Sequence, residues 1–279
     1  MSYAPNSISR STAPPGVAAL IVATEPGRAL LDVIEPLVRA GVSAIVVVDD
    51  GSSAGRKWVL DRISMEPTVH LLRHARPQGR GAALKTGLQY ITEHLPHYTG
   101  VVTTAADARY AASDVVRLMR ALHSSPRLVI LGGAFCGNDG DPASAGSGQS
   151  LRTRMLGLVF QVVTHISLRD VQTPLRALPA ELLPLLLKVP GDEHDYEFSM
   201  LLHLAHHGYP MAEQDVYGGA ERPVGDSGRM SSSGWLNIAR ALLRSVPLVP
   251  LPRVPGAESA LDGPDTVRRT GSSKAQQTR

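Results

Sequence analysis

The chain has 279 residues, of which 43% are apolar and 19% charged, the composition of a globular protein that buries one large core. Its formal net charge is only +3, and aromatic residues make up 4% of the chain. Nucleic-acid-binding proteins concentrate basic charge and stacking aromatic side chains, so nucleic acid is not expected as a partner. Cys136 is the only cysteine, which excludes an intramolecular disulfide and a multi-cysteine metal site and fits a reducing cytoplasm.

The two ends of the chain differ in composition from its middle. Residues 1–16 are rich in Ser, Pro and Ala and lack the apolar core of a signal peptide, so they are expected to form a flexible arm. The chain beyond Pro255 has too little apolar surface to fold, and residues 247–279 are expected to be a disordered tail. Residues 17–246 then form a single domain. No run approaches the roughly 20 apolar residues that span a bilayer, so membrane contact would be peripheral.

Short apolar runs rich in β-branched residues alternate with helical patterns in the first half of the chain. Val17–Ala23 and Ala44–Asp49 have the pattern of strands that are buried on both faces of a parallel sheet. Further strands are expected at 68–73, 100–104 and 128–132, and helices at 82–94, 113–123, 151–165, 180–188, 196–207 and 234–243. This order predicts an α/β fold with a doubly wound, mostly parallel sheet, whose ligands bind where the strands end.

Two carboxylates follow the second expected strand. In the segment VVVDDGSS, Asp49 and Asp50 stand where the strand gives way to a Gly-Ser turn. Side chains at the carboxyl end of a parallel strand can accept hydrogen bonds from a base or a ribose. The same residues also fit an ordinary Asp-Gly turn with a capping serine, so both interpretations stay open.

A glycine-rich segment, GRGAALKTG, opens the next expected helix. Its glycines, beginning with Gly79, would let backbone approach a phosphate, while Arg80 and Lys85 supply positive charge. A Walker A loop needs a glycine where Leu84 stands, so that motif is excluded. The spacing of the glycines excludes the dinucleotide fingerprint as well.

Five segments occur in the order found in one enzyme family. VVVDDGSS, RGAALKTG, VVTTAADARYAASDVVRLM, LRDVQTPLRALP and GDEHDYEFSMLL resemble, at these distances, the successive blocks of bacterial family 2 glycosyltransferases related to dolichol-phosphate mannose synthase. The resemblance covers about Val17 to Val216. It implies a GT-A fold and transfer of a hexose from a UDP- or GDP-sugar to a polyprenyl phosphate or a growing envelope polysaccharide. Such an enzyme would work in the cytoplasm or at the inner face of the membrane, in an oligomeric state that the sequence does not reveal.

The resemblance also implies a donor site. Asp50, with Asp49 beside it, and the strand-end residues Thr24 and Glu25 would hold the nucleotide. In the relatives, an Asp-x-Asp motif and a nearby glutamine ligate Mg²⁺ or Mn²⁺ across the diphosphate. The corresponding positions in this sequence are Ala105, Asp107 and Arg109.

Asp107 is therefore the one candidate metal ligand of this motif and a candidate catalytic residue. A hard divalent cation prefers several oxygen ligands, so the expected metal site is weak, although Mg²⁺ can also arrive bound to the nucleotide. One hypothesis is that Arg109 neutralises the diphosphate in place of the metal. The other is that the domain has lost transfer chemistry and serves as a binding or scaffold subunit in polysaccharide biosynthesis. A nucleotidyltransferase is less favoured, because no Gly-rich pyrophosphorylase loop follows the first strand.

Basic and polar residues of the second half are candidates for binding the acceptor. These are Arg152, Arg154, Asp170, Gln172 and Arg176. An arginine-lined pocket would favour a polyprenyl phosphate, which is already anionic and needs no general base, whereas a sugar hydroxyl needs one. The arginines fit a solvated helix face equally well. Pro174 stands where the relatives have glycine, so this loop is expected to have altered geometry.

Asp195 and Glu197 lie in the last of the five segments, beside the expected cleft. Either carboxylate could act as a general base toward a hydroxyl, or hold a structural hydrogen bond. Three histidines follow on the same expected helix, but they lack the His-Glu-x-x-His spacing of a zinc site. We therefore interpret them as a surface or core cluster.

Overall fold

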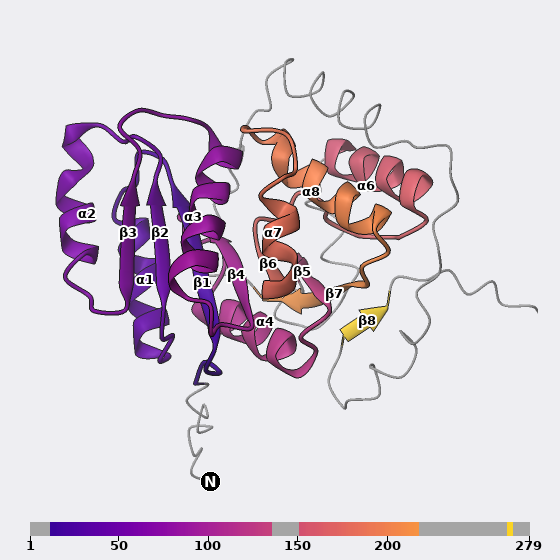
Figure 1. Ribbon diagram of the computed structural model, residues 1–279, viewed down its shortest axis with the longest axis horizontal. Coiled ribbons are helices and arrows are strands. Elements are labelled where there is room, and N and C mark those ends of the chain that lie inside the picture. Colours follow the sequence, from indigo (N-terminus) through magenta and orange to yellow (C-terminus); the bar gives the residue numbers. More distant parts are fainter. Residues whose placement is uncertain (1–11, 136–150, 218–266, 270–279) are drawn as a thin grey trace, which may run out of the picture.

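The computed structural model describes residues 12–135, 151–217 and 267–269, which form an eight-stranded sheet with helices on both faces (Figure 1). The strand order is β3-β2-β1-β4-β6-β5-β7-β8. The strands are β1 (Val17–Ala23), β2 (Ile45–Asp49), β3 (Val69–Arg73), β4 (Gly100–Ala105), β5 (Val129–Phe135), β6 (Arg176–Pro179), β7 (Met211–Val216) and β8 (Val267–Arg269). Neighbouring strands are parallel except where β6 pairs with β4 and β5 and where β8 pairs with β7. The expected α/β fold with a mostly parallel sheet is confirmed.

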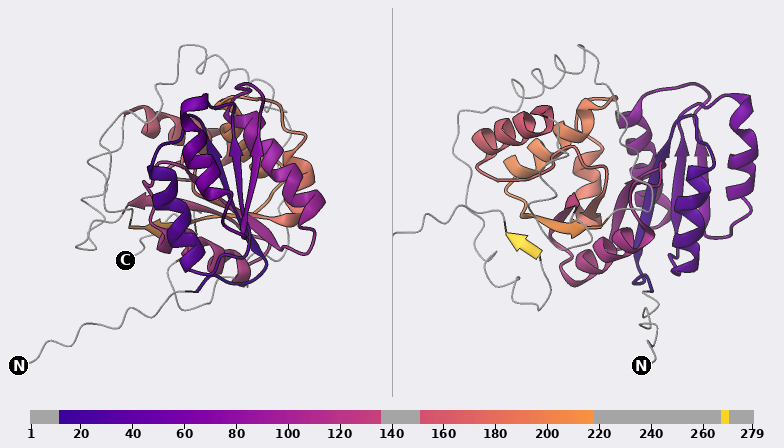
Figure 2. Two further views of the ribbon diagram at one scale, coloured as in Figure 1. Left: turned by 90° about the vertical axis from the view of Figure 1, so that its left-hand side faces the viewer. Right: turned by 180° about the vertical axis from the view of Figure 1, so that it is seen from behind.

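Helices lie on both faces of the sheet, as two further views show (Figure 2), and an apolar layer lies between the sheet and its helices on each face. On one face lie α1 (Ala29–Arg39), α2 (Lys57–Ile63) and α4 (Ala112–Ser124). On the other lie α3 (Arg80–His94), α6 (Leu151–Thr164), α7 (Leu183–Leu186) and α8 (Asp195–His206). Every side chain of β1 is buried, because this strand lies inside the sheet and is covered on both faces. The uninterrupted apolar runs of the sequence follow from this double covering.

The second half of the chain contains more strand than its sequence suggests. β6 and β7 complete the sheet where only helices were expected, because both strands carry buried polar side chains that break the apolar pattern, among them Arg176 and Glu213. The helix expected at 180–188 is instead a 3₁₀ turn (Ala180–Leu182) followed by the four-residue α7. The helix expected at 234–243 lies outside the described residues.

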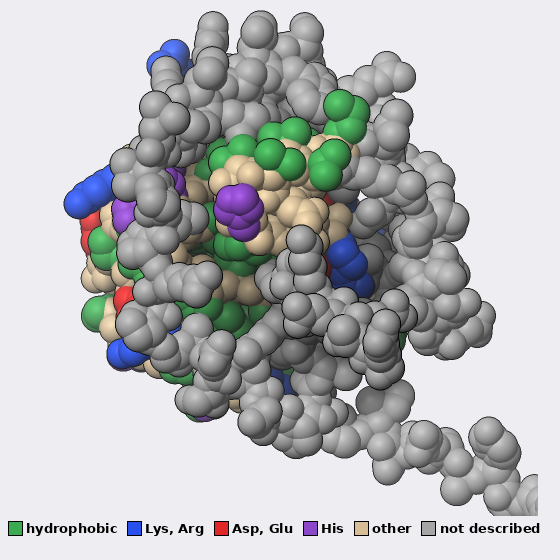
Figure 3. Space-filling model, turned by 90° about the vertical axis from the view of Figure 1, so that its right-hand side faces the viewer, with side chains coloured by type: hydrophobic (Ala, Val, Ile, Leu, Met, Phe, Trp, Pro, Cys, Tyr) green, Lys and Arg blue, Asp and Glu red, His purple; other side chains and the backbone are tan. Residues whose placement is uncertain are grey.

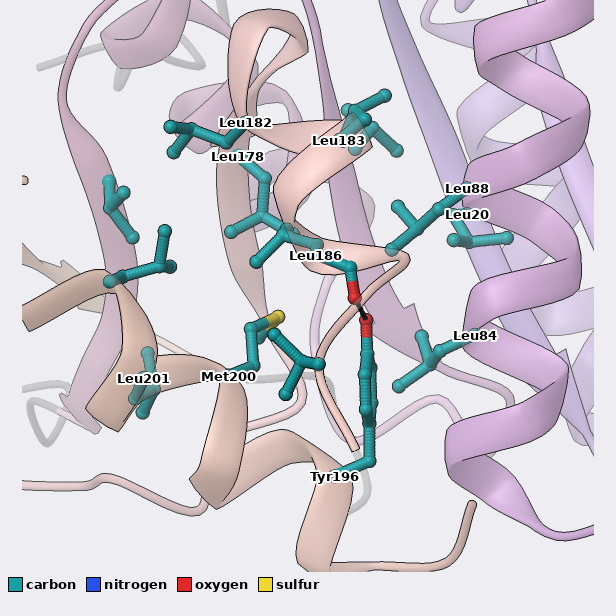
Figure 4. Packing of buried hydrophobic residues seen from close by; sticks show 14 of the residues in the cluster. Leu20, Leu84, Leu88, Leu178, Leu182, Leu183, Leu186, Tyr196, Met200 and Leu201 are labelled. Atoms are coloured by element: carbon teal, nitrogen blue, oxygen red, sulfur yellow. Dashed lines mark hydrogen bonds between the residues drawn. The ribbon is translucent and has the colours of Figure 1, made fainter. Parts of the chain in front are cut away.

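Helix α3 is held between the sheet and α8. Leu84 and Leu88 of α3 face Leu20 of β1, and Tyr196 of α8 reaches past them (Figure 4). The Tyr196 hydroxyl donates a hydrogen bond to the carbonyl oxygen of Leu186 at 3.0 Å. Since burial also raises the pKa of Tyr196, this hydroxyl stays a neutral donor. This hydrogen bond ties the start of α8 to the end of α7.

Helix α6 leaves part of its surface uncovered by the described residues. Met155, Leu158 and Val162 are 52%, 61% and 67% exposed, and Figure 3 shows hydrophobic side chains on this side of the molecule. Their spacing of three and four residues places them on one side of the helix. No helix in the described part of the chain is long and apolar enough to cross a membrane.

The contact between α3 and β1 is close enough to exclude any side chain at Gly87. A Cβ atom there would lie 2.2 Å from a methyl group of buried Leu20. We predict that Gly87→Ala lowers the free energy of unfolding by about 1–3 kcal/mol through overpacking, although alanine favours helix. Urea denaturation measures the change. Gly27→Ala is the control, since nothing lies within 4 Å of a Cβ at that position, and an equal effect of both substitutions would contradict the prediction.

Candidate active site

The candidate residues gather at the edge of the sheet where the parallel strands end. β6 runs in the opposite direction, so the loop that leads into it, residues 169–175, reaches this edge too. Thr103 of β4 pairs with Arg176 across the ladder, and its hydroxyl donates to the carbonyl oxygen of Pro174 at 2.7 Å. The loop is tied a second time by the hydroxyls of Tyr110 and Thr173, 3.1 Å apart. These contacts join the residues after β4 to the residues before β6.

Asp50 holds the loop that leads into α3. Its buried carboxylate accepts hydrogen bonds from the backbone N–H groups of Gln78 at 2.8 Å and Gly79 at 3.0 Å. Nδ1 of His74 lies 2.7 Å from the same carboxylate. Burial raises the pKa of Asp50, but these hydrogen bonds outweigh burial and hold that pKa below its usual value. Both carboxylate oxygens are thus engaged by the protein, and contact with a nucleotide stays a prediction.

Asp49 is bonded to its neighbours in a similar way. One oxygen accepts the backbone N–H of Ser52 at 3.2 Å, and the other lies 3.0 Å from Nε of Arg73. Asp49 itself is fully buried. Its bond to the backbone at Ser52 is the turn that the Asp-Gly interpretation of the sequence describes.

Glu25 and Thr24 lie after β1 at the same edge and are exposed. The Glu25 carboxylate accepts hydrogen bonds from the backbone N–H and the hydroxyl of Ser53 at 2.6 and 2.9 Å, and from Arg56 Nε at 3.1 Å. The hydrogen bonds from Ser53, followed by that from Arg56, lower the pKa of Glu25. Glu25 therefore joins the loops after β1 and β2, beside the exposed side chain of Thr24.

The glycines at the start of α3 allow it to approach the loop before α8. Gly79 has φ +100°, and a Cβ there would lie 2.4 Å from the carbonyl oxygen of Asp192. A Cβ at Gly81 would lie 2.5 Å from Cβ of Tyr196. Lys85 turns to this loop as well, with Nζ 2.9 Å from Asp192 Oδ1 and 5.0 Å from the centre of the Tyr196 ring. Close packing thus explains the glycines, and phosphate binding by this segment stays a prediction.

A buried carboxylate lies between two arginines where α3, β6 and α8 meet. Glu197 Oε2 accepts from Nε of Arg80 at 2.9 Å, and Oε1 accepts from Nη1 of Arg176 at 2.7 Å. Burial raises the pKa of Glu197, but the charges of Arg80 and Arg176 outweigh it and lower that pKa to about 2. A carboxylate with so low a pKa is a poor proton acceptor at neutral pH, because catalytic bases work best near the operating pH. The geometry favours the structural interpretation of Glu197.

Asp107 and Arg109 form an ion pair directly after β4. Nε of Arg109 lies 3.0 and 2.8 Å from the two carboxylate oxygens of Asp107, and the terminal nitrogen bonds the same group. Ala108 between them has φ 55°, a turn that brings both side chains to one side. Burial lowers the pKa of Arg109, but its hydrogen bonds to Asp107 outweigh burial and raise it, so the guanidinium stays charged.

Asp170 lies on the loop before β6 and is partly exposed. Its Oδ1 accepts the backbone N–H of Gln172 at 2.9 Å, and its own N–H donates to Glu213 Oε1 at 3.2 Å. Burial is the largest influence on its carboxyl group and raises its pKa, although the positive charges of Arg176 and Arg109 act against it. Asp170 is thus close enough to Arg109 for the two charges to interact.

The sequence of this chain matches a family model over the segment that contains most of these residues. Residues 25–171, more than half of the chain, match the model described as Glycosyl transferase family 2. The chain belongs to this family. No curated protein matches the sequence of this glycosyltransferase.

Solved structures share the fold of the glycosyltransferase. A structure described as a mycobacterial protein is 18% identical at a TM-score of 0.56, with 81% of this chain and 74% of that chain covered. Glucosyl-3-phosphoglycerate synthase from Mycobacterium tuberculosis, solved with Mn²⁺, UDP and phosphoglyceric acid, is 17% identical at the same TM-score, with 81% and 78% covered. At these identities the likeness concerns the fold alone.

In the glycosyltransferase, the side chains at the expected metal-binding motif do not offer enough oxygen ligands to hold a divalent cation. Ala105 contributes no ligand, and the carboxylate of Asp107 is taken up by Arg109. Within residues 12–135, 151–217 and 267–269, no three His, Cys, Asp or Glu side chains are grouped as a metal site requires. Hard cations need several oxygen ligands, so we assign no step of the reaction to a protein-bound metal.

The expected site residues fall into neighbouring groups. Asp49, Asp50 and Glu25 fix the loops after β1 and β2, Glu197 joins Arg80 to Arg176, and Asp170 lies near Arg109. Arg176 links the last two groups, since it bonds Glu197 and its charge acts on Asp170. The side chains of Arg152 and Arg154 lie outside the described residues, as does Cys136.

The sequence did not indicate the roles of Glu213 and Asp215, the two acidic partners of Arg169. Buried Glu213 of β7 accepts from the backbone N–H and Nε of Arg169 at 2.7 and 3.0 Å. Nη2 of Arg169 also lies 2.6 Å from Asp215 Oδ1. The sequence pattern that could have predicted them is the segment MAEQDV, in which two acidic residues alternate with other residues. A carboxylate that is buried in the core requires a cationic partner.

The Arg80–Glu197–Arg176 cluster should contribute to the free energy of unfolding. Glu197→Gln leaves buried Arg176 and half-buried Arg80 without their counter-charge, and we expect it to lower the free energy of unfolding by about 3–5 kcal/mol at pH 7. The pKa of Glu197 in the folded protein, about 2, lies below the ordinary value of 4.5 for a glutamate. Its stabilising contribution is therefore present above pH 4.5 and is lost as the pH falls toward 2.

Urea denaturation of the wild type and the variant at pH 7 and at pH 3 tests this prediction. The difference between the two proteins should shrink at the lower pH. Glu66→Gln is the matched control, because Glu66 pairs with Arg62 on the surface and such pairs contribute about 1 kcal/mol or less. A difference that does not change with pH would contradict the assignment of the low pKa to Glu197.

Proposed function

We propose that this family 2 glycosyltransferase moves a hexose from a nucleoside-diphosphate sugar to an acceptor bound before β6. The carrying observation is the Asp107–Arg109 pair, which stands where the family's metal-binding motif would stand and presents a charged guanidinium instead. The family match and the UDP-bound synthase of the same fold support a nucleotide-sugar donor.

Arg109 is proposed to stabilise the leaving group. A guanidinium offers a planar fork of N–H donors that matches phosphate oxygens, and the negative charge on the diphosphate grows as the bond to the sugar breaks. In the free protein this fork is bound to Asp107, whose side chain is 42% exposed. We propose that the diphosphate takes the place of Asp107 on the fork. By family analogy the acceptor attacks the anomeric carbon directly and inverts its configuration.

The rest of the donor site is proposed to lie along the loops after β1, β2 and β3. Thr24 is exposed at the end of β1, beside the turn that Asp50 and Glu25 hold in place. A fixed turn presents its backbone groups to a ligand without an ordering cost on binding. Arg80 and Lys85 would reach the phosphates only after leaving Glu197 and Asp192.

Two classes of acceptor fit a transferase of this kind. A lipid phosphate would place the enzyme at a membrane surface, and the exposed apolar side of α6 supports such a contact. A sugar hydroxyl would require a general base in the site.

A silent binding or scaffold domain is the alternative function. Ala105 and the closed Asp107–Arg109 pair favour it, since both remove metal ligands. Turnover of radiolabelled UDP- and GDP-sugars with membrane lipid extracts as acceptor separates the two functions. Transfer by the wild type that collapses in Arg109→Ala would exclude the silent domain, whereas donor binding without any transfer would favour it.

The role of Arg109 gives a prediction for donor binding. Arg109→Ala should weaken the binding of UDP by about 10- to 100-fold, because a hydrogen bond to a charged group contributes about 1.5–3 kcal/mol. Ala105→Asp, which restores a family ligand, should weaken it less. Calorimetric titration with UDP, with and without Mn²⁺, measures both.

Arg39→Ala is the control for loss of positive charge, because Arg39 lies at the far end of α1 and is exposed. Equal affinities of the wild type and Arg109→Ala would refute the proposed contact with the diphosphate. Absence of nucleotide binding by the wild type under either condition would refute the donor site as a whole.

A further inference from the structure

His74 stands directly after β3, and both nitrogens of its ring are bonded. Nδ1 lies 2.7 Å from Oδ1 of Asp50, which follows β2, and Nε2 lies 3.0 Å from the hydroxyl of Thr86 in the second turn of α3. The side chain of His74 is only 7% exposed. One buried ring therefore joins the end of β2 to α3.

The partners of the ring decide what each nitrogen does. Burial raises the pKa of Asp50, but hydrogen bonds from the protein outweigh it, so the carboxylate is ionised at neutral pH and only accepts. Nδ1 of His74 therefore carries a proton and donates. The Thr86 hydroxyl also lies 3.1 Å from the carbonyl oxygen of Ala82. Since a hydroxyl can both donate and accept, its contact with Nε2 is satisfied in either protonation state of the ring.

The loop between β3 and α3 is wrapped around the carboxylate that His74 bonds. At its first residue, the backbone N–H of His74 donates to the carbonyl oxygen of Asp49 at 2.9 Å. At its last residues, the N–H groups of Gln78 and Gly79 donate to the Asp50 carboxylate at 2.8 and 3.0 Å. Both ends of the loop are thus anchored on the residues that end β2.

The middle of the same loop supports the turn after β2. A Cβ atom at Gly51 would lie 2.3 Å from the carbonyl carbon of Arg76 and 2.4 Å from the nitrogen of Pro77, so the two backbones are in close contact. The turn continues to Ser52, whose hydroxyl accepts the N–H of Glu25 after β1 at 2.9 Å. The loops after β1, β2 and β3, which are proposed to hold the donor, are therefore connected to one another.

Among the residues that the structure describes, His74 is the only side chain bonded to Asp50, whose other partners are backbone N–H groups. Without the imidazole, a buried carboxylate would lose a donor, which costs free energy unless the group turns toward water. If it turned, the N–H groups of Gln78 and Gly79 would lose their acceptor. A loop that has to be ordered when a ligand binds lowers the affinity for that ligand.

We propose that His74 is a positioning residue of the donor site. Its ring places the Asp50 carboxylate so that the loop after β3 and the turn after β2 keep the shape that binds the nucleotide. This proposal rests on the donor site of the proposed function. His74 is buried and acts through Asp50 without contacting the donor or the reacting atoms.

Two substitutions of His74 separate the contacts of its ring. The side-chain nitrogen of asparagine is attached to Cγ, as is Nδ1 of histidine, so His74→Asn can keep the bond to Asp50. The nitrogen of glutamine lies one bond further out, so His74→Gln can keep only the contact with Thr86. We expect the dissociation constants for UDP and GDP to rise about 10-fold or more in His74→Ala and His74→Gln, the contribution of a hydrogen bond to a charged group. In His74→Asn they should stay within about threefold of the wild type.

The contact with Thr86 has a matched pair of variants. Thr86→Val removes the hydroxyl that orients the ring and should weaken nucleotide binding by about 3- to 10-fold, the range of a neutral hydrogen bond. Thr86→Ser keeps the hydroxyl and should bind as the wild type does. His123→Ala is the control for loss of an imidazole, because His123 is exposed in the last turn of α4. Calorimetric titration measures all of these affinities.

Two readouts separate positioning from general support of the fold. Free imidazole should restore part of the nucleotide affinity of His74→Ala, because it can occupy the space that the side chain leaves. Hydrogen exchange followed by mass spectrometry should show the amides of residues 74–79 exchanging about 10-fold faster in His74→Ala than in the wild type, without nucleotide. Urea denaturation shows whether each variant is folded.

The outcomes that would overturn the proposal differ from those that would remove the donor site. A wild type that binds UDP or GDP no more tightly than folded His74→Ala refutes the role of His74 and leaves the donor site standing. If His74→Ala does not fold, the other pair decides, and an affinity kept in His74→Gln but lost in His74→Asn refutes the role. A wild type that binds neither nucleotide refutes the donor site and, with it, the proposal.

Discussion

The ion cluster of Arg80, Glu197 and Arg176 is the interaction on which the rest of the site depends. It joins the first residue of α3, the first residue of β6 and the first turn of α8, three elements far apart in the sequence. Breaking a buried ion pair leaves an uncompensated charge, so none of the three can move away at small cost. The glycines of α3 serve the same junction, because they let the helix approach α8 closely enough for Arg80 to reach Glu197.

The acidic side chains of this region are of two kinds, those that are buried and bonded by the protein and those that a ligand can reach. Glu197, Glu213 and Asp50 are saturated by donors from the chain and are buried. Asp170 and Asp107 are partly exposed, so a ligand can reach these carboxylates and compete with the protein groups that bond them. The structural carboxylates position the loops on which the open ones lie. Pre-organisation of this kind allows a site to bind charge without a resident metal.

The sequence predicted the fold well, because strands buried on both faces leave uninterrupted apolar runs such as that of β1. It could not predict β6 and β7, whose buried Arg176 and Glu213 look like surface residues until their partners are known. The location of Asp170 near Arg109 could not be derived either, because it depends on β6 entering the sheet beside β4. The resemblance identified the family, while the ion pairs between distant residues, which determine the side-chain partners, are not visible in the sequence.

The reversed direction of β6 means that the segments proposed to hold the two substrates come from different parts of the sequence. The loops proposed to hold the donor follow strands in the first 110 residues, whereas the loop that carries Asp170 precedes β6, a strand from the second half of the chain that lies between β4 and β5. Insertions or exchanges in that later segment can alter which molecule receives the sugar while the nucleotide half stays as it is.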